Sequence, residues 1–205
     1  MHKRQHKARK SDILNAAIAS FLHDGYSASN IDSIAQRAGV SKPTVYKHFD
    51  SKIDIFCKMI QHMVTHLGEE QADLSHARSL APQEGLHFVA KSVIRKFYQE
   101  DLILLYRLVI GESRNFPEMG EALAQCFCDA AHQNVQDLLR HYVNTRQADI
   151  DDVDAATRQF MVLLEEPIIS ILFMRRDAVP GEKEQNEIVK HSVNMFWHYY
   201  KRNQS

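Results

Sequence analysis

Apolar residues recur every three or four positions along most of this chain of 205 residues, which is the spacing of one face of an α-helix. Only seven glycines and five prolines occur, and no alternating apolar run bounded by turn residues indicates a strand. We therefore predict an all-α fold. After residue 51 the pattern predicts helices over residues 52–76, 82–98, 101–113, 117–145, 151–176 and 181–203.

The first helix of the chain is predicted to begin with Ser11 as its cap and to end at Gly25. Its apolar stripe consists of Ile13, Leu14, Ala17, Ile18, Phe21 and Leu22, and a small core is completed by Ile31, Ile34, Val45 and Phe49. Such a small domain buries little surface alone, so we expect it to pack against the helix that begins near Lys52.

Two short helices follow directly. Ser29 is followed three positions later by Asp32, a variant of the capping box that predicts a helix start. Gly39 closes this helix, Ser41 caps the next one, and Pro43 lies in a first turn, where proline loses no hydrogen bond. Two capped helices joined by about four residues form a helix-turn-helix, whose second helix enters the major groove of DNA.

The charge of the chain is distributed unevenly. Residues 1–50 carry eight Lys and Arg against four Asp and Glu, a net charge of +4, whereas residues 51–205 have a net charge of −5. A basic head beside an acidic body is expected of a protein that meets phosphates at one end only. Residues 1–10 taken alone are typical of a solvated tail, but the neighbouring helix-turn-helix favours DNA binding.

The same residues resemble the TetR (tetracycline-repressor) family of transcriptional regulators. The resemblance covers about Ser11 to Lys58, and the segment from Gly111 to Pro117 is similar to a stretch of the AcrR-like branch. The motifs that carry it are Phe21, Gly25-Tyr26, Ile34-Ala35, Ala38 to Ser41, Thr44 to Phe49 and Ser51-Lys52.

The resemblance implies a double-stranded DNA operator as partner and assigns contacts to it. Tyr46, His48 and Lys52 are expected mainly on phosphates, and Thr44 also faces the DNA. The candidates to read base edges are Lys42, Lys47 and Pro43. A lysine can donate to guanine O6 and N7, and a proline ring can pack on a thymine methyl group. The full predicted DNA-binding set is Ser29, Ser41, Lys42, Pro43, Thr44, Tyr46, Lys47, His48 and Lys52.

Two segments near the carboxyl end are too apolar for an ordinary surface. Residues 160–164 and 168–174 flank Glu165-Glu166-Pro167, and residues 188–200 are apolar on more than one face. A membrane span is not expected, because burying the acid pair is costly and each uninterrupted run is short. We predict instead a four-helix seam of a homodimer, as the resemblance also implies. Its predicted residues are Phe160, Leu164, Ile168, Ile171, Val193 and Trp197.

The middle helices are predicted to enclose a pocket for a small apolar or amphipathic effector. Its predicted lining is Met63, Phe88, Tyr106, Phe127, His132 and Phe160, although each of these residues equally suits the core of any helical protein. His62 and His66 have a spacing able to hold a metal, but no cysteine or acid completes such a site, and we predict none. No motif for a cofactor or for catalysis occurs, so we expect no cofactor and no enzyme.

We therefore predict a DNA-binding domain over residues 1–51 and an effector-binding and dimerisation domain over residues 52–205. Three cysteines and the lack of an export signal lead us to expect a cytoplasmic protein. The predicted function is repression of transcription, released by the effector. An activator, a regulator without a ligand, and more distantly a helical enzyme or scaffold remain as alternatives.

Overall fold

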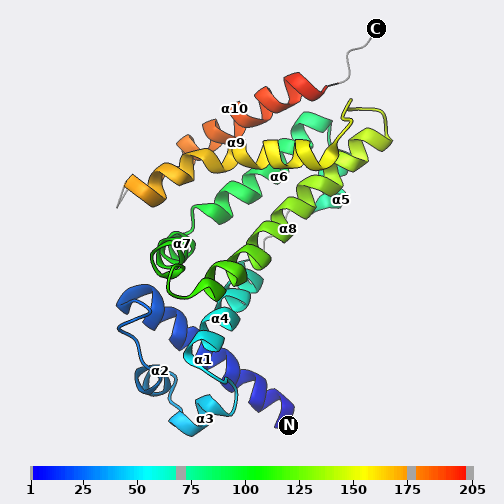
Figure 1. Cartoon of the computed structure of the whole chain (residues 1–205). Coiled ribbons are helices and arrows are strands. Elements are labelled where there is room, and N and C mark those ends of the chain that lie inside the picture. Colours follow the sequence, from blue (N-terminus) through cyan, green and yellow to red (C-terminus); the bar gives the residue numbers. More distant parts are fainter. Residues whose placement is uncertain (1, 68–72, 175–178, 202–205) are drawn as a thin grey trace. The chain divides into compact units, whose positions relative to one another are not determined.

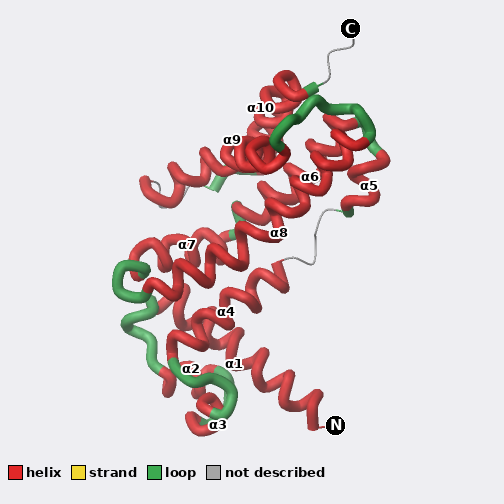
Figure 2. The backbone as a smooth tube through the Cα atoms, turned by 45° about the vertical axis from the view of Figure 1, so that its right-hand side comes forward, coloured by secondary structure: helices red, strands yellow, loops and turns green. Residues whose placement is uncertain are grey.

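The computed structural model describes residues 2–67, 73–174 and 179–201, with only the backbone described at 2–8, 64–67, 127–131, 170 and 174. No strand is drawn among the described residues (Figure 2), and a single isolated bridge joins Ala148 to Lys201. The elements in Figure 1 are α1 (His2–Asp24), α2 (Ile31–Arg37), α3 (Lys42–Tyr46), α4 (Lys52–Leu67), α5 (Leu74–Ser79), α6 (Pro82–Phe97), α7 (Glu100–Glu112), α8 (Pro117–Asn144), α9 (Val153–Met174) and α10 (Glu182–Tyr200). The predicted all-α fold is confirmed.

The helices predicted from residue 82 onward are confirmed over the described residues to within a few positions, whereas residues 175–176 and 202–203 of those predictions lie outside the described residues. Two predictions near the amino end are wrong. Helix α1 already begins at His2, so residues 2–10 are helical and Ser11 is an interior residue rather than a cap. The helix predicted over 52–76 is two helices, because α4 ends at Leu67 and α5 has its own cap. Asp73 provides that cap by accepting hydrogen bonds from the backbone N–H groups of Ser75 and His76.

Contacts divide the chain into two compact units. The head unit comprises Met1–Glu69 with Leu104–Phe127, and the body unit comprises Glu70–Ile103 with Cys128–Ser205. The predicted division after residue 51 does not coincide with this boundary. Helix α4 packs against α1 and buries Ile55, Phe56, Met59 and Ile60, so it belongs to the head unit.

An aromatic cluster forms the core of the head unit. The rings of Phe21, Tyr26 and Phe56 lie 5.3–5.6 Å apart between centroids, and Phe116 joins them at 4.8 Å from Tyr26. Offset and edge-on aromatic pairs at this spacing add to the stabilisation that burial gives. Phe116 follows α7, so the core of the head unit includes residues far along the chain.

Helix α6 lies at the centre of the body unit, where it packs against α5, α9 and α10. Its buried residues recur in steps of one and three positions and form one broad face: Gly85, Leu86, Val89, Ala90, Val93, Ile94 and Phe97. A broad apolar face can contact several helices at once, and in the body unit those helices are α5, α9 and α10.

Candidate DNA-binding interface and subunit face

A tight turn after α2 sets the direction of α3. Gly39 has a φ of +66°, in the left-handed region that favours glycine. Its N–H donates to the Gln36 carbonyl at 3.1 Å, and the Val40 N–H donates to the Ala35 carbonyl at 3.0 Å. These two bonds satisfy the last carbonyls of α2 in a Schellman motif. The predicted closure of this helix by Gly39 is confirmed.

Helix α3 starts where the sequence predicts. Ser41 is its cap, and its Oγ accepts from the Thr44 N–H at 3.4 Å and lies 2.8 Å from the Thr44 hydroxyl. Pro43 stands in the first turn, where no partner for an N–H is needed. The short recognition helix is therefore fixed at its start by side chains from its own sequence.

The predicted capping box at Ser29 is wrong. The cap of α2 is Asn30, whose Oδ1 accepts from the Ser33 N–H at 2.8 Å. The Ser29 hydroxyl is buried and lies within donating distance of the carbonyl groups of Ser20 (3.0 Å) and Gly25 (2.7 Å). Ser29 thus ties α1 to the turn that follows it, and we leave it out of the DNA surface.

The two sides of α3 differ sharply in exposure. Val45 and Phe49 are 0% and 1% exposed, which confirms their prediction as core residues. Tyr46 is 49% exposed, and the side chain of Lys42 is 48% exposed. Pro43 and Lys47 are exposed as well, whereas Thr44 and His48 are half-buried. The predicted DNA-facing residues of α3 therefore occupy its outer side, opposite the two core side chains.

Lys52 occupies the start of α4 in a packed position. Its ammonium lies 4.2 Å from the centroid of the Tyr26 ring, and burial lowers its pKa while Glu112 opposes that change. Burial also raises the pKa of Tyr26 to about 12, with smaller contributions from Cys57, Glu118 and Glu112. The Ser27 hydroxyl donates to Glu112 Oε1 at 2.9 Å, so the end of α7 is held on the same turn.

Two further lysines flank the end of the recognition segment, and we did not predict them as site residues. The ammonium groups of Lys10 and Lys58 lie 5.9 and 5.6 Å from the centroid of the Phe49 ring. Lys58 also pairs with Asp54 at 2.8 Å. The net positive charge of the first fifty residues was the available signal for Lys10, but residue spacing alone could not place it beside Phe49.

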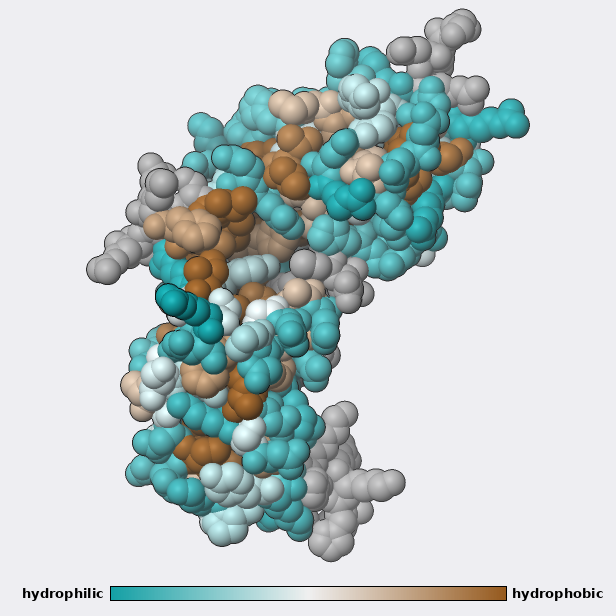
Figure 3. Space-filling view, viewed as in Figure 1, coloured by the Kyte–Doolittle hydropathy of each residue, from teal (hydrophilic) through white to brown (hydrophobic). Residues whose placement is uncertain are grey.

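A second surface of interest lies on α9 and α10 in the body unit. Large apolar side chains are exposed there: Val162, Ile169, Phe173, Met195 and Tyr199. In Figure 3 the region of these helices shows brown apolar patches among teal side chains. We call these five residues the outer stripe.

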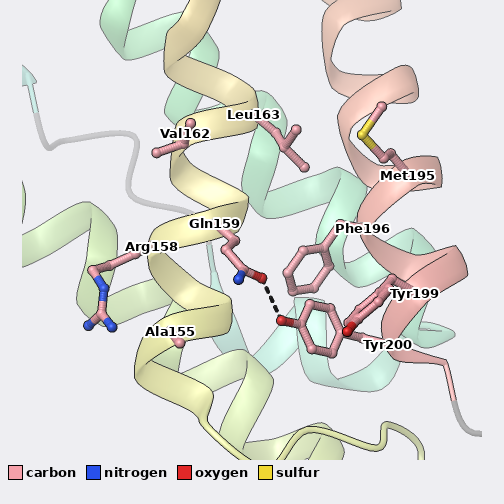
Figure 4. A pocket seen from close by; sticks show the side chains of 9 residues that line it. All are labelled: Ala155, Arg158, Gln159, Val162, Leu163, Met195, Phe196, Tyr199 and Tyr200. Atoms are coloured by element: carbon pink, nitrogen blue, oxygen red, sulfur yellow. Dashed lines mark hydrogen bonds between the residues drawn. The ribbon is translucent and has the colours of Figure 1, made fainter.

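A groove of about 650 Å³ runs between α9 and α10 along part of the outer stripe. Figure 4 shows Phe196, Tyr199 and Tyr200 on one side and Gln159, Val162 and Leu163 on the other. The Tyr200 hydroxyl donates to Gln159 Oε1 at 2.5 Å across the groove. The groove is mainly apolar, and this bond joins the two helices at one end.

Most of the residues predicted for the subunit seam are buried within the subunit. Five of the six are buried inside the chain itself, and Trp197 is half-buried against Tyr142 at 6.2 Å between ring centroids. Those five are Phe160, Leu164, Ile168, Ile171 and Val193. Because a side chain enclosed by its own subunit offers little area to a second copy, the outer stripe takes their place as the candidate seam.

Models of known protein families match both the amino-terminal and the carboxyl-terminal part of the chain. Residues 13–58 match the model described as bacterial regulatory proteins of the tetR family, and residues 84–202, more than half of the chain, match the AefR-like transcriptional repressor C-terminal domain. The chain belongs to the TetR family. It is a transcriptional regulator with a helix-turn-helix, as predicted.

Individual relatives of this TetR-family chain agree with the family match. The regulator AcrR of Shigella flexneri is 21% identical over 83% of this chain and 79% of its own length, in keeping with the predicted AcrR-like branch. The activator FasR of Mycolicibacterium smegmatis is 44% identical over 59 residues, and the match spans 29% of this chain and only 27% of that relative.

Solved structures share the fold over nearly the whole chain. A TetR-family regulator from Mesorhizobium loti has a TM-score of 0.84 at 23% identity, covering 96% of this chain and 98% of its own. The flavonoid-responsive regulator FrrA has a TM-score of 0.77 at 25% identity over the same shares of the two chains.

The predicted effector-binding residues of this TetR-family chain are distributed over both units. Met63 and Tyr106 belong to the head unit, whereas Phe88, His132 and Phe160 belong to the body unit, and the side chain of Phe127 lies outside the described residues. Phe160 is 0% exposed and packs on Phe196 at 4.8 Å between ring centroids. None of the six lines the groove between α9 and α10. Phe160 therefore belongs to the core of the body unit, and its role in effector binding stays a prediction.

His62, one of the two histidines with metal-binding spacing, contacts a residue of α1. His62 Nε2 lies 2.9 Å from Asn15 Oδ1, and the side chain of His66 lies outside the described residues. No group of three metal-ligating side chains occurs among the side chains that the structure describes. Within the described ranges, no helix has the length and apolar character that crossing a bilayer requires.

Proposed function

We propose that this chain is a homodimeric repressor that binds a palindromic operator through α3 and is released from it by a small apolar or amphipathic effector. The repressor assignment is supported by the match of residues 84–202 to the AefR-like repressor domain. The proposal also places the protein in the cytoplasm, where its DNA would be accessible.

The observation that carries the DNA-binding part is the exposure pattern of α3. Lys42, Pro43, Tyr46 and Lys47 point outward from a helix whose inner side is held by Val45. A helix of this kind can place its outer side in the major groove while neighbouring cations contact phosphates. Lys52 and Lys10 are the cations that would contact the phosphates of the DNA backbone. Each of them already packs on an aromatic ring.

A second copy is proposed because one α3 reads only half of a palindrome. Two recognition helices on one face of DNA must be about 34 Å apart, which requires a fixed pair of subunits. The outer stripe supports a seam there, since large apolar side chains exposed on two packed helices are typical of protein contacts. Helices packing at such a seam would form a four-helix arrangement with two helices from each subunit.

Release by an effector would work through the spacing of the two α3 helices. An effector that binds better to a dimer whose spacing does not fit B-DNA lowers operator affinity by its difference in affinity for the two states. The structural similarity to FrrA, which is flavonoid-responsive, supports an effector that is small and largely apolar.

An activator is the second candidate, because the relative FasR is an activator and is 44% identical over its matched 59 residues. That match spans little more than a quarter of FasR, so it supports an activator less than a match over the whole length would. Transcription from the bound promoter in vitro separates the candidates: a repressor lowers the transcript and an activator raises it.

The test of DNA binding starts from selection of bound fragments from genomic DNA by the full chain, followed by titration of the selected sequence. We expect a palindrome and an affinity that falls steeply with salt, as phosphate contacts require. Tyr46→Ala and Lys47→Ala should each weaken operator binding by about 1–3 kcal/mol without changing the melting temperature. A chain that enriches no sequence and ignores duplex DNA at low salt would refute the proposed function.

A further inference from the structure

One acidic residue lies directly beside a lysine of the DNA-facing side of α3. Asp32 Oδ2, in the first turn of α2, is 2.8 Å from Lys42 Nζ at the start of α3. The hydrogen bond to Asp32 raises the pKa of Lys42. Lys47, farther along the same exposed side, has no ion pair among the residues that the structure describes. The two lysines that face DNA are therefore held differently.

Stability does not explain this pair. The side chains of Lys42 and Asp32 are 48% and 66% exposed, and exposed pairs of this kind contribute little to folding. Helix α2 is already fixed by the Asn30 cap and by the turn at Gly39, and α3 by the Ser41 cap. The fold would keep its turn without the pair.

The negative charge of Asp32 lowers the general electrostatic attraction between this surface and DNA. A carboxylate next to a DNA-facing lysine weakens the sequence-independent attraction between cations and DNA phosphates. The same carboxylate restricts a flexible ammonium to one region in front of α3, and an ammonium held in place can favour guanine O6 and N7 at one position. Weaker binding to duplex DNA in general, combined with an ammonium donor held in one place, increases discrimination between the operator and other DNA.

We propose that Asp32 is a specificity-determining residue: it holds Lys42 so that this lysine reads one guanine in each half-site, and it penalises binding to other DNA. Asp32 is a positioning residue, because it acts on the base through Lys42. The inference rests on the proposed function, since it assumes that α3 enters the major groove.

The test compares sequence preference rather than affinity alone. Wild-type protein and Asp32→Asn are each used to select from a library in which both half-sites are randomised. In Asp32→Asn we expect the guanine preference to be lost at one position per half-site, while binding to random duplex becomes tighter. The ratio of operator to random-DNA affinity should fall by roughly fivefold or more, within the range that one base contact supplies.

The chain provides a matched control for loss of an acid in the head. Asp24 forms an exposed pair with Arg37 at 3.3 Å, so Asp24→Asn removes the same charge from the head without touching α3. It should change the affinity for operator and random DNA alike and leave the base preferences as they are. Asp32→Glu keeps a carboxylate within reach of Lys42 and should retain most of the guanine preference.

Lys42→Ala should lose the same guanine position, and adding Asp32→Asn to it should change that preference no further. If Asp32→Asn keeps the wild-type preference, or if Asp24→Asn loses it equally, the inference is refuted. Both outcomes presuppose a wild-type protein that selects a palindrome. A wild-type chain that selects nothing would refute the proposed function instead.

Discussion

Gly85 is a residue whose importance comes from its neighbours rather than from its backbone angles. It is buried in α6, and a Cβ built on it would overlap the Tyr142 hydroxyl and lie 2.5 Å from the Ala77 carbonyl oxygen. Only a residue without a side chain allows α5, α6 and Tyr142 to come this close. Gly111 in α7 has nothing within 4 Å of the same added atom.

We predict that Gly85→Ala destabilises the protein and that Gly111→Ala does not. Overpacking of this kind costs about 1–3 kcal/mol, because backbone and ring must move apart. In a chain of this size that lowers the melting temperature by roughly 2–10 °C. Gly111→Ala, the matched control, should be neutral or gain about 0.5 kcal/mol from helix propensity. Thermal melting followed by circular dichroism measures both, and equal melting temperatures for the two variants would contradict the packing argument.

At the residue scale, a helix cap could be predicted from the sequence where its hydrogen-bond partner is a near neighbour in the chain. It could not be predicted where the deciding partner is distant in the chain. Ser41 was identified as a cap because its partner, Thr44, is three residues away. Ser29 and Asn30 are equally suitable caps by residue type. What decides between them is the carbonyl of Ser20, which α1 brings next to Ser29, and no local pattern contains that information.

At the scale of elements, α9 shows that the span of a helix can be predicted correctly while its buried and exposed faces are assigned the wrong way round. The prediction of its span was sound, because the apolar spacing continues through Pro167. A helix that is apolar nearly all round has no polar side to mark the solvent, so periodicity could not tell Ile168 from Ile169. The structure separates them: Ile168 is 5% exposed and Ile169 is 52% exposed.

We predict that Ile169→Glu and Met195→Glu each weaken the proposed homodimer. A carboxylate buried between two subunits is costly, and the apolar contact is lost as well. We expect the dissociation constant of the dimer to rise roughly 10–100-fold for each change. Sedimentation at graded protein concentrations measures this, and the melting of each variant should show that the subunit still folds.

Two comparison variants make the seam prediction specific. Ile110 on α7 is exposed to 45% but lies outside the outer stripe, so Ile110→Glu should leave the dimer intact. Ile171 is 5% exposed, so Ile171→Asp should lower the melting temperature rather than simply separate folded copies. A dimer that survives both stripe variants but not Ile110→Glu would move the seam to α7.

At the scale of the whole molecule, the boundary between units could not be read from the sequence. The head unit gains residues 104–127 through contacts between segments far apart in the chain, such as Ser27 with Glu112 and Tyr26 with Phe116. Composition marked the basic first fifty residues and the helix-turn-helix within them. It gave no sign that the turn at Tyr26 would be completed by residues after α7, because such pairings have no local pattern.

Phe116 supports the turn at Tyr26 from a segment far along the chain. Phe116→Ala removes a ring that contacts Tyr26, and Tyr26 in turn supports Lys52 at the start of α4. Because Phe116 is only half-buried, we expect a cost of about 2 kcal/mol, below the ~3–5 kcal/mol of a fully buried phenylalanine. The loss should appear as faster amide hydrogen exchange in residues 13–26 and 52–60, with little change in α6, and as weaker operator binding. The exposed neighbour Asn115→Ala serves as the control and should change neither. If exchange in residues 13–26 stayed at the wild-type rate, the turn after α7 would not be part of the folding unit of the head, and a head that ends before α5 would be the better description.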